Sequence, residues 1–249
     1  MYKTLIGVNI LTSIQSQPYV NHMQFWYRLG RQYPEDQFFF MTPPRMSIDR
    51  MRNESAKIAL DQECDYLMFI DDDVLVPITA YRDLVEMMTL GYDVAAGVVI
   101  IRGYPYDVML FKEEYKNGRL GLPRFNDYKE HINDDGFSVN CGAVGFSCVL
   151  ISVSLLKKIK PPYFVTGTRN TEDIYFCIKA KVQVPGVKIG ATLKVKCGHL
   201  GVPSVYTPEN RLLYKDLNEK EDPTLLSPYD STNRSDEYIE KCLSSLELT

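Results

Sequence analysis

Three consecutive carboxylates, Asp71, Asp72 and Asp73, follow an apolar run at residues 66–70. A short run of apolar and aromatic residues predicts a buried strand. In open α/β sheets, ligands bind beyond the carboxyl ends of such strands. Adjacent negative charges repel one another, and a divalent cation that prefers oxygen ligands, Mg²⁺ or Mn²⁺, offsets this repulsion. The triad therefore indicates a metal site, with a solvated acidic turn as the alternative.

Further residues with chemical potential occur later in the chain. Glu172 and Asp173 stand at the expected start of a helix, and His199 lies in a Gly-His-Leu-Gly sequence after an expected strand. Gly142 and Gly145 interrupt an apolar run, and glycine inside a strand marks close approach by another group. Nothing local relates these positions to the carboxylate triad, so only the fold can bring them together.

The first hundred residues predict alternating strands and helices. Apolar runs predict strands at 5–11, 37–41, 66–70 and 94–101, and apolar residues at helical spacing predict helices at 20–33, 48–62 and 79–89. This order predicts an α/β protein with a mostly parallel, Rossmann-like sheet flanked by helices. The pattern G-x-G-x-x-G is missing after the first strand, which argues against an NAD-binding domain.

The second half of the chain is less regular. Residues 104–137 form an excursion rich in Tyr, Pro, Asp and Lys, and loops of that length are usually functional. We then expect a strand at 139–152, helices at 154–159 and 171–181, a strand at 187–195 and a helix at 235–246. The predicted catalytic domain spans residues 1–201, with a nucleotide-binding half at 1–103 and an acceptor half at 104–201, followed by a C-terminal extension at 202–249.

We expect the excursion and the C-terminal extension to form the acceptor side and a mobile cover. Tyr104, Tyr106, Tyr115 and Tyr128 offer flat surfaces of the kind on which sugar rings pack. The alternative is an ordered surface loop that packs on its own side chains.

The composition is that of an ordinary soluble globular protein, with 249 residues, 45% of them apolar and 24% charged. A net charge of −4 gives no global attraction to nucleic acid or anionic membranes. No apolar run reaches the roughly 18 residues of a transmembrane segment, so we expect a cytoplasmic protein, in the host cytoplasm if the chain is viral. Six scattered cysteines without a C-x-x-C pair predict buried reduced thiols rather than a zinc site.

Taken in order, the motifs resemble those of the GT-A glycosyltransferases, particularly the family-2-like group. The resemblance covers residues 3–201 and rests on the Asp triad as a DxD motif, the glycine stretch at 141–145, the Glu172-Asp173 pair and the late His199. It implies a GT-A fold and a metal-dependent transfer of a sugar from a nucleotide-sugar donor to an acceptor hydroxyl, with inversion. The acceptor would be a glycan, a lipid-linked saccharide, a protein or a modified nucleobase.

The resemblance also implies roles for individual residues. Asp71, Asp73 and His199 would ligate Mn²⁺ or Mg²⁺. Asp173 would be the general base that deprotonates the acceptor, and Glu172 would lie near the acceptor or orient the loop. The nucleotide-sugar donor is expected to contact Val8, Asn9, Ile10, Thr42, Pro43, Arg52, Asp71, Asp72, Gly142 and Gly145.

Each assignment has a structural alternative. His199 could be a core or turn histidine, and Glu172 and Asp173 could serve only to stabilise a helix N-terminus. Arg52, expected to pair with phosphate, could be an exposed helix arginine, and the glycines could mark a close strand–helix crossing. His22 and His131 are assigned no role in the site.

Alternatives also exist at the level of function. A nucleotidyltransferase would use the same carboxylates to hold Mg²⁺, although its early signature rich in glycine and basic residues is missing from residues 7–17. A retaining GT-A glycosyltransferase shares the acidic motif and the histidine ligand. A binding module with a degenerate site is disfavoured by the intact motifs.

Overall fold

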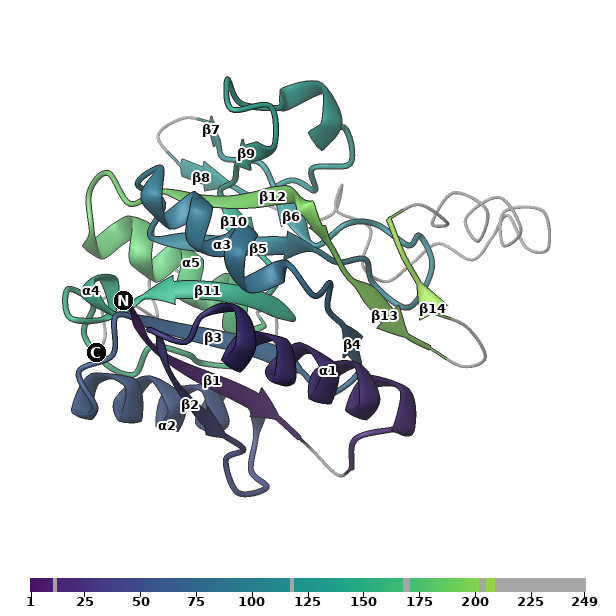
Figure 1. Cartoon of the computed structure of the whole chain (residues 1–249). Coiled ribbons are helices and arrows are strands. Elements are labelled where there is room, and N and C mark those ends of the chain that lie inside the picture. Colours follow the sequence, from purple (N-terminus) through teal and green to yellow (C-terminus); the bar gives the residue numbers. More distant parts are fainter. Residues whose placement is uncertain (11–12, 117–118, 168–170, 202–204, 209–249) are drawn as a thin grey trace.

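The computed structural model describes residues 1–10, 13–116, 119–167, 171–201 and 205–208. Its centre is a seven-stranded sheet with the strand order β2-β1-β3-β11-β5-β12-β9 (Figure 1). The strands are β1 (Lys3–Asn9), β2 (Gln37–Met41), β3 (Tyr66–Asp71), β5 (Val94–Val98), β9 (Ser138–Asn140), β11 (Cys148–Ser152) and β12 (Ile189–Lys196). Strand β11 runs antiparallel to both β3 and β5, and β9 runs antiparallel to β12, whereas the remaining pairs are parallel.

Helices cover both faces of this sheet (Figure 1). They are α1 (Ser16–Gln32), α2 (Ile48–Asp61), α3 (Ala80–Thr89), α4 (Val153–Leu156) and α5 (Glu172–Gln183), with a 3₁₀ turn η1 (Tyr128–His131). Successive side chains of a strand point to opposite faces. In β3, Leu67 and Phe69 therefore join the core formed with α2, α4 and α5, whereas Met68 and Ile70 join the core formed with α1 and α3. The predicted class, an α/β protein with a mostly parallel, Rossmann-like sheet between helices, is confirmed.

Within the described residues, short strands form three further small sheets outside the main one. Strand β6 (Leu110–Phe111) pairs with β10 (Ala143–Val144), and β7 (Glu114–Lys116) pairs with β8 (Arg119–Gly121). Strand β13 (Gly198–Leu200) lies between β4 (Val74–Leu75) and β14 (Val205–Tyr206). Because β4 follows the carboxylate triad and β13 contains His199, this small sheet joins the two parts of the predicted metal site.

Two local predictions are wrong. Helix α1 begins at Ser16 and includes Pro18, where we expected a break before residue 20. Proline is tolerated there because the N–H groups of the first helical turn have no intrahelical partner. The apolar run at 139–152 is divided among β9, β10 and β11, and these strands belong to two different sheets.

The expectation of buried reduced thiols is confirmed where the structure describes the chain. Cys64, Cys141, Cys148, Cys177 and Cys197 are all buried and free. Within the described ranges, no helix has both the length and the apolar character that crossing a membrane requires. Most of the extension at 202–249, including the helix expected at 235–246, lies outside the described residues.

Candidate active site

The carboxylate triad lies at the carboxyl end of β3, as its sequence predicts. Asn9, the last residue of β1, pairs in register with Asp71, the last residue of β3. The backbone N–H of Asp71 donates to the carbonyl oxygen of Ser147 at 3.0 Å, which links this edge of the sheet to the turn before β11. The four residues of β3 from Leu67 to Ile70 are buried, whereas all three carboxylates are partly exposed. The buried strand therefore ends where its acidic residues reach solvent.

His199 lies beside Asp73. Strands β13 and β4 pair His199 with Val74, and the backbone N–H of Leu200 donates to the carbonyl oxygen of Asp73 at 2.8 Å. This pairing places Nε2 of His199 3.5 Å from Oδ1 of Asp73. The fold thus brings together two residues that the sequence analysis assigned to one metal site.

A hydrogen bond at the second ring nitrogen fixes the tautomer of the neutral His199 ring. Its Nδ1 lies 2.7 Å from the carbonyl oxygen of Ile100. A carbonyl oxygen only accepts, so Nδ1 carries a proton, and in the neutral ring Nε2 presents a lone pair toward the carboxylate of Asp73. Metal-binding histidines commonly donate their other N–H in this way. In the protonated ring Nε2 donates to the carboxylate of Asp73, and in the neutral ring its lone pair and that carboxylate can together hold a divalent cation.

Arg102 contacts the other oxygen of Asp73. Its Nη1 lies 2.8 Å from Oδ2, and 53% of its side chain is exposed. Burial acts to raise the pKa of Asp73, but the hydrogen bond and charge of His199 and the charge of Arg102 outweigh it and hold the pKa below its ordinary value. Asp73 is therefore ionised at neutral pH. Arg102 was not predicted as a site residue, because the turn that aims it at Asp73 has no local signature.

Arg52 is buried at the base of the site. Only 2% of the residue is exposed, so the alternative of an exposed helix arginine is wrong. Its guanidinium donates from Nε to Oε1 of Glu172 at 3.0 Å, from Nη2 to Oδ1 of Asp71 at 3.1 Å and from Nη1 to the carbonyl oxygen of Phe146 at 3.1 Å. The guanidinium of Arg52, which we expected to bind a phosphate, is therefore bound by carboxylates of the protein.

Burial raises the pKa of both carboxylates that Arg52 holds. In Asp71 and in Glu172 the largest cause is the loss of solvation, and the positive charge of Arg52 opposes it. The guanidinium of Arg52 therefore offsets the lost solvation of two carboxylates where helix α2, strand β3 and helix α5 meet.

A cavity of about 220 Å³ opens beside these groups. It is lined by Asn9, Ile48, Met51, Arg52, Asp71, Asp72, Asp73 and Glu172. Of the other predicted donor contacts, Val8, Ile10, Thr42 and Pro43 are not among the lining residues. Ile48 and Met51 were not predicted, although the start of a helix directly after a strand and turn places its first residues at the carboxyl edge of the sheet.

The amide of Asn9 indicates that a polar ligand belongs in this cavity. Asn9 is 3% exposed, and neither its Nδ2 nor its Oδ1 has a hydrogen-bond partner. Leaving a buried polar group unpaired costs about 1–3 kcal/mol. A ligand that offers both a donor and an acceptor removes this penalty.

Asn9→Leu is therefore expected to raise the free energy of unfolding of the ligand-free protein by about 1 kcal/mol and to weaken nucleotide binding. The leucine has a similar size and removes the two unpaired atoms. Denaturant unfolding measures the first effect, and titration with nucleoside diphosphates in the presence of Mn²⁺ measures the second.

Asn53→Leu provides the matched control. The amide of Asn53 donates to the carbonyl oxygens of Asp49 and Phe164 and accepts from the N–H groups of Tyr163 and Phe164, so its loss should destabilise the protein. An Asn9→Leu protein that is as destabilised as Asn53→Leu and binds nucleotides normally contradicts the ligand assignment.

Glu172 and Asp173 form the first turn of α5, and both are buried. Glu172 lines the cavity and bonds to Arg52. Asp173 is not among the lining residues, and its Oδ1 accepts the N–H of Ile174 at 2.7 Å. The two neighbours therefore have different surroundings. Glu172 binds Arg52, whereas Asp173 accepts a hydrogen bond at the N-terminus of its own helix.

Packing within the protein accounts for Gly142 and Gly145. A Cβ at Gly142 would lie 2.5 Å from Cδ2 of Leu122 and 2.7 Å from the carbonyl oxygen of Lys112. A Cβ at Gly145 would lie 2.8 Å from Cβ of Met109. The close approach that these glycines permit is therefore between two segments of the protein. The alternative of close packing was a strand–helix crossing, but the segment that approaches is the chain at residues 109–122.

The excursion at 104–137 contributes to the core more than expected. Tyr106 and Tyr128 are 7% and 3% exposed and pack in the main hydrophobic cluster, so the expectation that they offer surfaces to sugars is wrong. Tyr104 is partly buried against the same cluster, whereas Tyr115 on β7 is 63% exposed. Strands β6 to β8 order this segment, which weak periodicity in the sequence did not predict.

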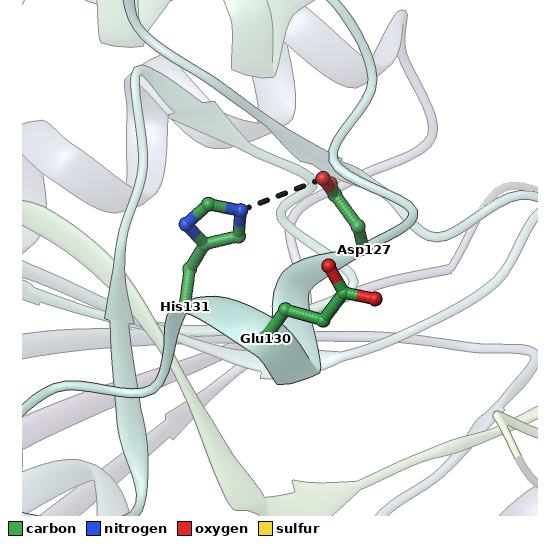
Figure 2. A group of neighbouring side chains, drawn as sticks. All are labelled: Asp127, Glu130 and His131. Atoms are coloured by element: carbon green, nitrogen blue, oxygen red, sulfur yellow. Dashed lines mark ion pairs between the residues drawn. The ribbon is translucent and has the colours of Figure 1, made fainter.

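A second group of metal-binding side-chain types lies on and beside η1 (Figure 2). Asp127, Glu130 and His131 place one ligand atom each within 4.8 Å of one another, and all three side chains are exposed. Lys112 already contacts Asp127 at 2.8 Å and is the main cause of the lowered pKa of that carboxyl. A cation would have to displace this ammonium group, so the pair at Asp73 and His199 is the better candidate.

No protein-family model matches the chain, and no curated protein matches it. Among solved structures, one described as A197 from STIV is 19% identical over 83% of this chain and 91% of its own, with a TM-score of 0.57. GalNAc-T7 with UDP, GalNAc and Mn²⁺ is 11% identical over 80% of this chain and 44% of its own, with a TM-score of 0.47. TarS of S. aureus is 15% identical over 76% of this chain and 58% of its own, with a TM-score of 0.41. The likeness to A197 shows a shared fold, and any argument for the chemistry depends on the site itself.

Proposed function

We propose that this chain is a metal-dependent GT-A glycosyltransferase that moves a sugar from a nucleoside-diphosphate donor to an acceptor hydroxyl, with inversion. The observation that carries the proposal is the pair formed by Asp73 and His199. Its two ligand atoms lie 3.5 Å apart, and the second ring nitrogen of the histidine is anchored on Ile100. A cavity lined by Asp73 and by the unpaired amide of Asn9 lies beside it. A cation site next to a polar cavity at the carboxyl edge of a Rossmann-like sheet suits a nucleotide diphosphate.

Asp73 and His199 would hold the cation, and Asp71 would be its third ligand from the protein. A bound Mn²⁺ or Mg²⁺ stabilises the negative charge that develops on a departing diphosphate. Arg52 keeps Asp71 in a fixed orientation, and Asp72 lines the same cavity. Asn9 is free to bond to the nucleoside, and Ile48 and Met51 provide apolar walls for it.

Asp173 is the residue to which we assign the acceptor proton. Asp173 stands in the first turn of α5, and a carboxylate can accept the proton of a hydroxyl group as a general base. Glu172, bonded to Arg52, would position this turn of the helix. The acceptor would approach from the side of α5, with the exposed Tyr115 on β7 the remaining candidate for stacking on a sugar.

Product analysis tests this function. The protein is incubated with a panel of nucleotide sugars and Mn²⁺, and the expected result is metal-dependent release of a nucleoside diphosphate. Pyrophosphate release from nucleoside triphosphates and sugar phosphates would instead support a nucleotidyltransferase. Release of neither product would contradict both enzymatic functions and favour a binding module.

Asp73→Ala and His199→Ala are each expected to weaken Mn²⁺-dependent binding of nucleoside diphosphates by on the order of 10- to 100-fold. The double variant should be little worse than either single variant, because two groups that act through one ion are not additive. Calorimetric titration measures all three affinities. Asp127→Ala combined with His131→Ala, in the exposed group of Figure 2, is the control and should bind normally. Fully additive losses at Asp73 and His199 would show that they do not share an ion.

A further inference from the structure

Two arginines contact the carboxylate triad, and their surroundings are opposite. Arg52 is 2% exposed, and three partners on three different segments hold it. The side chain of Arg102 is 53% exposed, and its Nη1 contacts Oδ2 of Asp73 at 2.8 Å. Arg52 therefore cannot move without breaking the base of the site, whereas Arg102 can leave its carboxylate at little cost.

The contact of Arg102 lies on the same carboxylate that would bind the proposed cation. One oxygen of Asp73 faces Nε2 of His199, and the other is held by the guanidinium. A divalent cation on this carboxylate would lie within a few ångströms of Arg102, and like charges at such distances repel strongly near a protein surface. Arg102 and the cation therefore compete for Asp73.

We propose that Arg102 neutralises Asp73 before the cation arrives and then binds the diphosphate of the donor. This inference rests on the proposed function. A guanidinium group presents its N–H donors in a planar fork that matches phosphate oxygens, and a diphosphate held by the same cation would be the nearest new anion. The phosphate role first expected of Arg52 thus belongs to Arg102, whose charge is not committed to the interior.

The local backbone supports a movement of the side chain alone. The turn that carries Arg102 is closed by hydrogen bonds from the N–H of Ile101 to the carbonyl oxygen of Asp107 at 3.0 Å and from the N–H of Tyr106 to that of Gly103 at 2.8 Å. The side chain of Arg102 is itself 53% exposed, so solvent surrounds much of it. The guanidinium can therefore rotate from Asp73 toward a ligand while the backbone keeps its position.

Arg102→Gln is expected to change the two affinities in opposite directions. Without the competing guanidinium, Mn²⁺ alone should bind about two- to fivefold more tightly, because a half-exposed ion pair contributes little free energy. With Mn²⁺ saturating, the affinity for the nucleoside diphosphate that wild type prefers among ADP, CDP, GDP and UDP should fall by about 10- to 100-fold, as expected for a lost bond to a charged group. Arg82→Gln is the matched control, since Arg82 is 60% exposed and contacts Asp83 at 2.8 Å on α3.

Calorimetry with Mn²⁺ alone, and then with the four diphosphates at saturating Mn²⁺, measures both effects on wild type and the two variants. Tighter Mn²⁺ binding with weaker diphosphate binding in Arg102→Gln alone supports the proposal. Equal or weaker Mn²⁺ binding in Arg102→Gln, or a diphosphate affinity like that of Arg82→Gln, overturns it while leaving the proposed function intact. If wild type binds neither Mn²⁺ nor any of the diphosphates, the proposed function fails, and this inference fails with it.

Discussion

Asp173→Asn is expected to lower the rate of sugar transfer by about 10²- to 10⁴-fold, while the affinities for Mn²⁺ and nucleoside diphosphate stay as in wild type. The amide keeps the shape of the carboxylate but does not accept a proton at neutral pH, and general-base catalysis typically contributes a factor of this size. The Oδ1 of Asp173 accepts only the N–H of its neighbour Ile174 among the bonds described, and the amide oxygen of asparagine can keep that bond. Single-turnover rates and calorimetric affinities separate chemistry from binding.

Glu172→Gln is the control for Asp173→Asn. It weakens the charged bond to Arg52, so it should lower the free energy of unfolding in addition to any effect on turnover. Asp173→Asn should leave the free energy of unfolding within about 0.5 kcal/mol of wild type. If Asp173→Asn keeps more than half of the wild-type turnover, then Asp173 only stabilises the helix, or the transfer retains configuration and needs no base.

Arg52→Met is expected to lower the free energy of unfolding by about 3–5 kcal/mol, the usual loss when one partner of a buried ion pair is removed. Met fills much of the same volume, so the loss reports on Asp71 and Glu172, which are left without their counter-charge. Arg50→Met, on the exposed face of the same helix, should stay within about 0.5 kcal/mol of wild type. Urea unfolding of the three proteins measures the difference. A loss of less than 1 kcal/mol in Arg52→Met would contradict the structural role.

The deficit of Arg52→Met should shrink as the pH falls from 7 toward 5. Burial already raises the folded-state pKa of Asp71 and Glu172, and removing Arg52 takes away the charge that opposes this shift. In the unfolded chain carboxyl groups titrate near about 4, so over this range the folded variant binds more protons than the unfolded chain. Its free energy of unfolding therefore rises as the pH is lowered, relative to that of wild type. A deficit that is independent of pH would show that the carboxylates already have another partner.

The parts of the site that follow from strand ends could be predicted from the sequence. A buried apolar run that ends in carboxylates must place them at the edge of a sheet, and Asp71 to Asp73 lie there. His199 was predicted only through the resemblance to GT-A glycosyltransferases, because the spacing of apolar residues does not indicate that β13 pairs with β4. The order of strands and helices in the first hundred residues was predictable because amphipathic spacing is a local property.

The parts that depend on contacts between distant segments could not be predicted. An arginine at position 52 has the same local sequence whether it faces solvent or is enclosed by Glu172, Asp71 and Phe146. The glycines at 142 and 145 signal a close approach, but not that Lys112, Leu122 and Met109 are the groups that approach. Pro18 looks like a boundary in the sequence, yet it is compatible with the first turn of a helix.

The position of β11 has a consequence for how the protein is synthesised. Because β11 lies between β3 and β5, these two strands lack their shared neighbour until residues 148–152 have left the ribosome. At about 5–20 residues per second, a nascent chain would spend roughly 3–10 s with both edges open, and open edges pair readily with other chains. The predicted nucleotide-binding half at residues 1–103 therefore does not complete its own sheet. Grafting that half onto another scaffold would have to carry residues 148–152 with it.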